Sequence, residues 1–108
     1  MSKLNEKHCA ACSGAVALLS PEQQAELLPQ LQGWEIVENH RLQKNYKFPD
    51  FKSALSFVNA VGEVAESENH HPNISFTWGK VQVEIFSHKL NGLTEADFIL
   101  AAKIDANN

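Results

Sequence analysis

The clearest fold signal in the chain is the stretch at residues 74–85, Ile74-Ser75-Phe76-Thr77-Trp78-Gly79-Lys80-Val81-Gln82-Val83-Glu84-Ile85. Apolar residues alternate with polar ones on both sides of Gly79-Lys80, and alternation with a period of two is typical of half-buried strands. A two-residue turn joins antiparallel neighbours. The stretch therefore predicts a β-hairpin with its turn at Gly79-Lys80, and we expect Trp78 to pack in the sheet core with Ile74 and Phe76.

A long amphipathic pattern precedes this hairpin at residues 51–68 and predicts a helix capped by Asp50. Its apolar positions recur at helical spacing and predict one face packed on a sheet: Phe51, Ala54, Leu55, Phe57, Val58, Val61, Val64 and Ala65. Two shorter extended patterns come before it, at residues 34–38 and 41–48. Asn39-His40 separates them and is good turn material. We predict a second antiparallel hairpin with a solvated His40 at its tip that has no functional role.

Helices are predicted at both ends of the patterned part of the chain. The first covers residues 21–32, where Ser20 and Gln23 have capping-box spacing and Gly33 follows the end. The last begins after Thr94, with Asp97 at the matching position of a second capping box. Hairpins separated by helices are typical of an antiparallel sheet with helices on one face. We predict an α+β fold, a single domain with a four-stranded antiparallel sheet and three helices packed on one face, in the order α-β-β-α-β-β-α.

Composition and charge limit the function classes. The 108 residues suffice for one domain, and 44% hydrophobic with 20% charged residues is the balance of a folded globular protein. A net charge of -4 without a run of Lys or Arg argues against nucleic-acid binding. No apolar run is long enough to cross a bilayer, and the N-terminus lacks the layout of a signal peptide. We expect no membrane contact and a cytoplasmic location.

Residues 1–19 have no clear period, so we interpret them as a flexible tail ahead of a folded domain at residues 20–108. Cys9 and Cys12 form a C-x-x-C pair directly after His8. A redox pair of this kind normally lies between a strand and a helix, and these three side chains are fewer ligands than a structural zinc site needs. A tail with two thiols is the favoured interpretation, and a metal-mediated contact between subunits is the alternative.

The candidate functional residues gather at the corner between the long helix and the following hairpin. His70 and His71 stand side by side before Pro72, and Glu66 lies in the last helical turn. The antiparallel return strand brings His88 back toward the same corner. Imidazole exchanges protons near neutral pH. Because no H-x-x-x-H or H-E-x-x-H spacing, Gly-rich phosphate loop or neighbouring nucleophile is present, the residues predict proton transfer to a small bound molecule, without a metal.

The spacing of these residues resembles the signature of the pterin-4a-carbinolamine dehydratase family: Glu66-x-x-x-His70-His71-Pro72, Trp78, His88 and Asp97, together with Gly33-Trp34 and Gly92-Leu93-Thr94-Glu95. The resemblance covers the chain from about Ser20 to its end. It implies dehydration of 4a-hydroxytetrahydrobiopterin to quinonoid dihydropterin and water, which recycles the pterin cofactor of aromatic amino acid hydroxylases. It also implies no cofactor, since the pterin is the substrate, a homodimer or homotetramer, and a phenylalanine hydroxylase upstream.

The resemblance also assigns roles by position. It implies three catalytic residues, His70, His71 and His88, and three substrate-binding residues, Asp97, Glu66 and Trp34. We expect His70 to be the principal proton-transfer residue, His88 to assist from another side of the pterin ring, and His71 to position the substrate. Purely structural roles stay open for the others: a helix start for Asp97, cover of a sheet edge for Trp34, and support of a histidine or plain solvation for Glu66.

Two rival functions come from the same resemblance. Animal relatives act as dimerisation partners of a homeodomain transcription factor, which would make this chain a non-catalytic binding module. Other relatives bind pterins in molybdopterin metabolism. The acidic composition weighs against the binding module, and the complete set of site residues weighs against the molybdopterin relative. The dehydratase is therefore the favoured function.

Overall fold

The computed structural model describes residues 17–106, so the predictions for His8, Cys9 and Cys12 lie outside the described residues. The described chain contains α1 (Pro21–Leu27), the 3-10 helix η3 (Leu28–Gln30), β1 (Glu35–Val37), β2 (Arg41–Lys47), α2 (Phe51–Glu68), β3 (Asn73–Thr77), β4 (Lys80–Ile85) and α3 (Glu95–Ala106). This order confirms the predicted succession of helices and hairpins. Of the predicted tail, residues 17–19 are described, and the Leu19 backbone N–H donates to the carbonyl oxygen of Leu93 at 2.8 Å.

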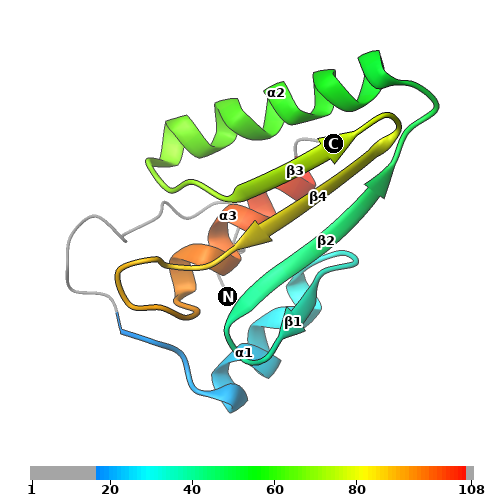
Figure 1. Cartoon of the computed structure of the whole chain (residues 1–108). Helices are drawn as coiled ribbons and strands as arrows, with labels where there is room; N and C mark the ends of the chain where they lie inside the picture. The colour runs from blue at the N-terminus through cyan, green and yellow to red at the C-terminus, as the bar shows by residue number, and fades with distance from the viewer. Residues whose placement is uncertain (1–16, 107–108) are drawn as a thin grey trace.

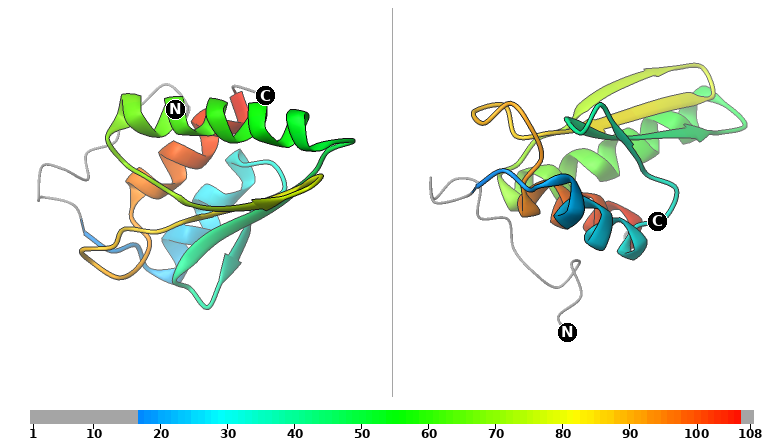
Figure 2. Two further views of the ribbon diagram at one scale, coloured as in Figure 1. Left: turned by 45° about the horizontal axis from the view of Figure 1, so that its top comes forward. Right: turned by 90° about the horizontal axis from the view of Figure 1, so that it is seen from below.

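The four strands form one antiparallel sheet in the order β1-β2-β4-β3 (Figure 1). β4 pairs with β2 on one side and with β3 on the other, which leaves β3 at an edge of the sheet. The three α-helices lie on the same face of the sheet, as the two views of Figure 2 show. The predicted α+β architecture is thereby confirmed.

α3 is buried on nearly all sides, because it lies between α1 and α2 beneath the sheet (Figure 2). Phe98, Leu100 and Ala101 have no exposed surface, and they pack with apolar residues of β2 and β4 in one core. An apolar surface on all sides suits a central helix. The polar residues Thr94 and Asp97 at its start are also fully buried, so they need hydrogen-bond partners inside the protein.

The first helix is shorter than predicted. The capping box is confirmed, since Ser20 Oγ accepts from the Gln23 backbone N–H at 3.2 Å and Gln23 Oε1 accepts from the Ser20 N–H at 2.9 Å. The predicted α-helical end at residue 32 is wrong, because the chain changes to a 3-10 turn at Leu28–Gln30. Pro29 has no N–H to donate to the carbonyl oxygen four residues earlier, which interrupts the α-helical hydrogen bonds and explains the change.

The long helix α2 has the predicted bounds and cap, with Asp50 Oδ1 accepting from the Ser53 N–H at 2.7 Å. Five of its predicted core residues are buried: Ala54, Phe57, Val61, Val64 and Ala65. The predicted burial of Phe51 and Leu55 is wrong, since they are 46% and 40% exposed. The reason is that this end of α2 lies beside β3, the edge strand, where Phe51 contacts the half-exposed ring of Phe76.

Two predictions for the hairpin tips are also wrong. Thr77 pairs with Lys80, so the second turn is Trp78-Gly79, one residue earlier than predicted, with Gly79 at φ 73°. Trp78 is therefore a turn residue with 65% exposure rather than a core residue. His40 is half-buried instead of solvated, because its ring packs 4.6 Å from the ring of Phe86 and Nε2 lies 2.9 Å from Asn91 Oδ1.

Candidate active site

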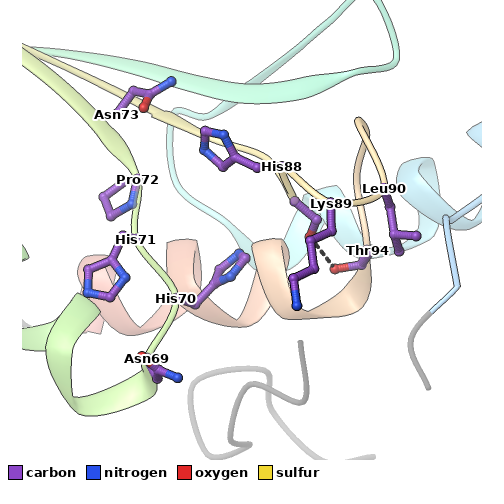
Figure 3. A pocket seen from close by; sticks show the side chains of 10 residues that line it. Asn69, His70, His71, Pro72, Asn73, His88, Lys89, Leu90 and Thr94 are labelled. Atoms are coloured by element: carbon purple, nitrogen blue, oxygen red, sulfur yellow. Dashed lines mark hydrogen bonds between the residues drawn. The ribbon is translucent and has the colours of Figure 1, made fainter. Parts of the chain in front are cut away.

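The three predicted catalytic histidines meet at one cavity of about 460 Å³. Figure 3 shows them around it, with His70 and His71 entering from the corner after α2 and His88 from the turn after β4. Antiparallel pairing of Asn73 with Glu84 puts the start of β3 beside the end of β4. The described residues that line it are Asn69, His70, His71, Pro72, Asn73, Ser87, His88, Lys89, Leu90 and Thr94.

The corner after α2 directs its two histidines differently. Asn69 ends the helix in the left-handed conformation with φ 51°, and the His70 N–H donates to the Ala65 carbonyl oxygen at 3.2 Å. Asn tolerates this backbone better than most residues. As a result His70 turns inward and is 8% exposed, whereas the His71 side chain remains 53% exposed. The corner thus supplies one buried and one accessible imidazole.

The buried imidazole is held by a carboxylate. His70 Nε2 lies 2.6 Å from Asp97 Oδ1, and Asp97 has no exposed surface. A carboxylate can only accept hydrogen bonds, so the His70 ring donates its Nε2 proton to Asp97. In the neutral ring this leaves Nδ1 unprotonated and able to accept a proton. Asp97 does not line the cavity, so its contact with the site runs through His70.

The second carboxylate oxygen is fixed by residues to which the sequence pattern assigned no role in the site. Asp97 Oδ2 accepts from the Ser87 hydroxyl at 3.0 Å and from the Thr94 backbone N–H at 2.8 Å. The hydroxyls of Ser87 and Thr94 are themselves 3.0 Å apart (dashed line in Figure 3). The contact of Thr94 with Asp97 could have been predicted from their capping-box spacing. The contact of Ser87 could have been predicted because Ser87 continues the inward-facing positions of the strand pattern, where a polar residue needs a hydrogen-bond partner.

The accessible imidazole also has a carboxylate partner. His71 Nε2 is in hydrogen-bond contact with Glu66 Oε2, and the Glu66 side chain is 78% exposed. Glu66 lies in the last turn of α2, where a carboxylate opposes the helix dipole. Its contact with His71 gives it a local reason to be there. Glu66 does not itself line the cavity, so the structure shows it as a support for His71.

Trp34 lies away from the histidines. Its side chain is buried, and its Nε1–H donates to Asp105 Oδ1 at 2.9 Å. Lys44 Nζ lies 3.1 Å from the same oxygen. Asp105 is near the end of α3, roughly 12 Å along the helix from Asp97 at 1.5 Å per residue. The structure therefore places Trp34, the residue before β1, in a contact with the last helix and outside the described cavity lining.

The described residues provide neither a metal-binding cluster nor a membrane span. Within residues 17–106, no group of three or more His, Cys, Asp and Glu side chains is arranged to hold a metal ion. None of the helices described in that range is both long enough and apolar enough to span a bilayer.

Comparison with known proteins gives the family. Residues 17–107 match the family model described as pterin 4 alpha carbinolamine dehydratase, and the chain belongs to this family. A relative from Rubrobacter xylanophilus, named as a candidate pterin-4-alpha-carbinolamine dehydratase, is 50% identical over 105 residues, which are 97% of this chain and 98% of that protein. A similarly named protein from Rickettsia canadensis is 50% identical over 107 residues, with 98% of each chain covered.

Solved structures share the fold. A transcriptional coactivator/pterin dehydratase from Brucella melitensis superposes with a TM-score of 0.78 at 32% identity, covering 84% of this chain and 98% of that one. A pterin dehydratase-like protein identified as a RuBisCO assembly factor of the alpha-carboxysome gives a TM-score of 0.59 at 26% identity, over 70% and 89% of the chains. The fold thus occurs in proteins that are described by different roles. The fold alone therefore does not assign a function to this chain, and the proposed function rests on the residues of the site.

Proposed function

We propose that this protein dehydrates 4a-hydroxytetrahydrobiopterin to quinonoid dihydropterin and water. The observation that carries the proposal is the His70–Asp97 pair at the wall of a cavity that His71 and His88 also line. In this reaction the C4a–O bond breaks as a proton reaches the departing hydroxyl, which leaves as water. A pterin ring nitrogen loses its proton as the C=N bond forms. One acid and one base are required, and imidazoles supply both.

The geometry supports a division of roles among the histidines. His70 is the base, because its Nε2–H is held by Asp97 and its Nδ1 is free to accept the ring proton. His88 is exposed and reaches the cavity from the turn after β4, away from the corner that holds His70 (Figure 3), and it delivers the proton to the hydroxyl. His71 positions the substrate, with Glu66 holding its Nε2 side. The protein needs no cofactor for this chemistry, since the pterin is the substrate.

The proposal extends to the metabolic setting. The substrate is the product of an aromatic amino acid hydroxylase, and we propose a phenylalanine hydroxylase as its source and the cytoplasm as the site of the reaction. The support is family membership together with the acid/base site. A coactivator role, which the Brucella melitensis relative carries in its name, would not require the buried His70–Asp97 pair.

Replacement of His70 tests the proposed role. The dehydration rate of freshly generated substrate is followed by stopped-flow absorbance with wild-type protein, His70→Ala and the control Glu63→Ala, an exposed residue of α2. We expect His70→Ala to lose roughly 10²-fold in kcat, at the low end of one general acid/base contribution because His71 and His88 remain, and Glu63→Ala to match the wild type. Equal rates for all three proteins would refute the role of His70.

We also propose that the protein forms a homodimer or homotetramer through the end of the sheet at β3. Exposed apolar side chains gather there: Phe51 and Leu55 on α2, Phe76 on β3 and Trp78 in the following turn. The rings of Phe51 and Phe76 are 5.4 Å apart, so the patch is continuous between the two elements. Within residues 17–106, β3 is an edge strand whose outer side pairs with no other strand. A second copy can pair its own β3 antiparallel to this edge and cover both patches symmetrically.

Sedimentation velocity tests this assembly. The wild type is compared with Trp78→Ser and with Leu18→Ser, which removes an exposed apolar side chain elsewhere. We expect a dimer or tetramer that dissociates in Trp78→Ser and persists in Leu18→Ser. A wild-type protein that sediments as a monomer would refute the assembly without affecting the proposed chemistry.

A further inference from the structure

We infer that His40 is a positioning residue for His88, an inference that rests on the proposed function of His88 as the acid. His40 lies in the turn between β1 and β2, far in sequence from the cavity. It nevertheless contacts the His88 turn in two ways. Its Nε2 is 2.9 Å from Asn91 Oδ1, and its ring is 4.6 Å from that of Phe86, which lies 4.2 Å from the ring of His88.

His88 needs such support because its own turn holds it weakly. Residues 88–91 form an exposed turn closed at its base by backbone hydrogen bonds of 2.8 and 3.4 Å between Ser87 and Gly92. Among the described residues, the His88 ring has no hydrogen bond, and its one aromatic contact is the stacked ring of Phe86. An exposed side chain on a turn loses positional order unless its neighbours restrict it. The orientation of His88 therefore depends on Phe86 and on the backbone of its turn.

His40 restrains both of these supports. Its Nε2–H donates to the amide oxygen of Asn91, which lies in the left-handed conformation at φ 53° and sets the path of the turn. Its ring packs against Phe86 at an interplanar angle of 41°, while Phe86 stacks on His88 at 28°. The three rings form a row from the β1–β2 turn to the cavity. One side chain thus anchors the turn through a hydrogen bond and the imidazole through an intervening ring.

His40 itself is well placed to act as an anchor. Its backbone N–H donates to the Val37 carbonyl oxygen at 2.9 Å, which closes the tight turn between two paired strands. Side chains fixed by a hairpin are suited to holding a less ordered segment. Misplacement of a catalytic group by about 1 Å can cost up to 10²-fold in rate. Without His40, the His88 ring is less ordered but still visits the correct position part of the time. We therefore expect a smaller loss, on the order of tenfold in kcat, when His40 is removed.

Matched variants separate the hydrogen bond from the ring contact. His40→Phe keeps the ring and loses the bond, and Asn91→Gly loses the same bond while allowing the left-handed backbone. Their double variant should lose no more kcat than either single variant, because both remove one interaction. His40→Ala removes both contacts and should lose the most. Glu35→Ala, an exposed change in β1, serves as the control.

The decisive readout is the NMR signal of the His88 ring protons, which does not require turnover. The ring current of Phe86 shifts these protons in the wild type, and we expect the shift to shrink in His40→Ala while the melting temperature and KM change little. Unchanged His88 signals in His40→Ala would overturn the inference. A wild-type protein without dehydratase activity would overturn the proposed function instead, and loss of the His88 shift in His40→Ala would still support the positioning.

Discussion

Replacement of Asp97 by Asn probes the proton chemistry with a nearly unchanged side-chain shape. Asp97 Oδ2 faces the Thr94 backbone N–H at 2.8 Å, and this donor cannot rotate. The amide of the variant must therefore keep its oxygen toward Thr94. Its NH₂ group then takes the place of Asp97 Oδ1, which in the wild type lies 2.6 Å from His70 Nε2. An NH₂ group donates, so Nε2 has to accept and the proton of the neutral His70 ring moves to Nδ1.

With its proton on Nδ1, the His70 ring can no longer act as the base. The loss of this base sets the size of the expected effect. One general acid/base contribution is worth about 10²- to 10⁴-fold, and we expect kcat of Asp97→Asn to fall by roughly 10²-fold, because His71 and His88 remain. KM should change little, since Asp97 does not line the cavity. The free energy of unfolding should fall by about 1–3 kcal/mol, the usual cost of weakening a buried charged hydrogen-bond set.

Asp105→Asn is the matched control. Asp105 is a second carboxylate of α3, with a side chain that is 7% exposed, and it is bound to Trp34, Lys44 and the backbone N–H of Gln32. Its replacement should lower stability to a similar extent and leave kcat unchanged. Stopped-flow absorbance gives the rates, and ¹⁵N shifts of the His70 ring report which nitrogen carries the proton. A His70 ring that changes tautomer while kcat stays at the wild-type value would refute the base role.

Three further predictions concern the supports of the site and the fold. Ser87→Ala removes one of the donors to Asp97 Oδ2 and should lower kcat by no more than about tenfold, since a single hydrogen bond contributes about 1 kcal/mol; stopped-flow rates check this. Gly79→Ala should lower the free energy of unfolding by more than about 1 kcal/mol in urea titrations, because φ is 73° and the new Cβ would lie 2.9 Å from a backbone carbonyl oxygen. A backbone hydrogen bond at the start of α2 lowers the pKa of Asp50, so its stabilising effect is present above the unfolded pKa and is lost as pH falls through the lower folded pKa. Melting temperatures measured against pH should accordingly fall less steeply in acid for Asp50→Ala than for the wild type.

The sequence predicts most of the fold because its local signals agree with one another. Asp50 and Ser20 cap the helices that the apolar spacing predicts. Antiparallel hairpin geometry also suffices to bring His88 back to the corner of His70 and His71. These inferences depend on residues close together in the chain or on the strand register of one hairpin, and the periodicity of apolar residues predicts both.

Long-range contacts explain what the sequence does not reveal. The His70–Asp97 bond joins residues 27 apart and the His40–Asn91 bond joins residues 51 apart. A turn displaced by one residue places Trp78 in the turn instead of in a strand, so its side chain lies at the surface. Trp34 similarly depends on how the first hairpin meets the end of α3. These placements follow from the packing of elements, for which the local pattern gives no signal.

The central claim is tested most directly by the rate at which 4a-hydroxytetrahydrobiopterin decays with the wild-type protein present. The substrate is generated freshly, and absorbance follows its loss together with the appearance of quinonoid dihydropterin. The proposed site predicts a decay that accelerates in proportion to the protein concentration and saturates with substrate, and that returns to the uncatalysed rate without protein. A correctly folded protein that leaves the decay rate unchanged would contradict the account.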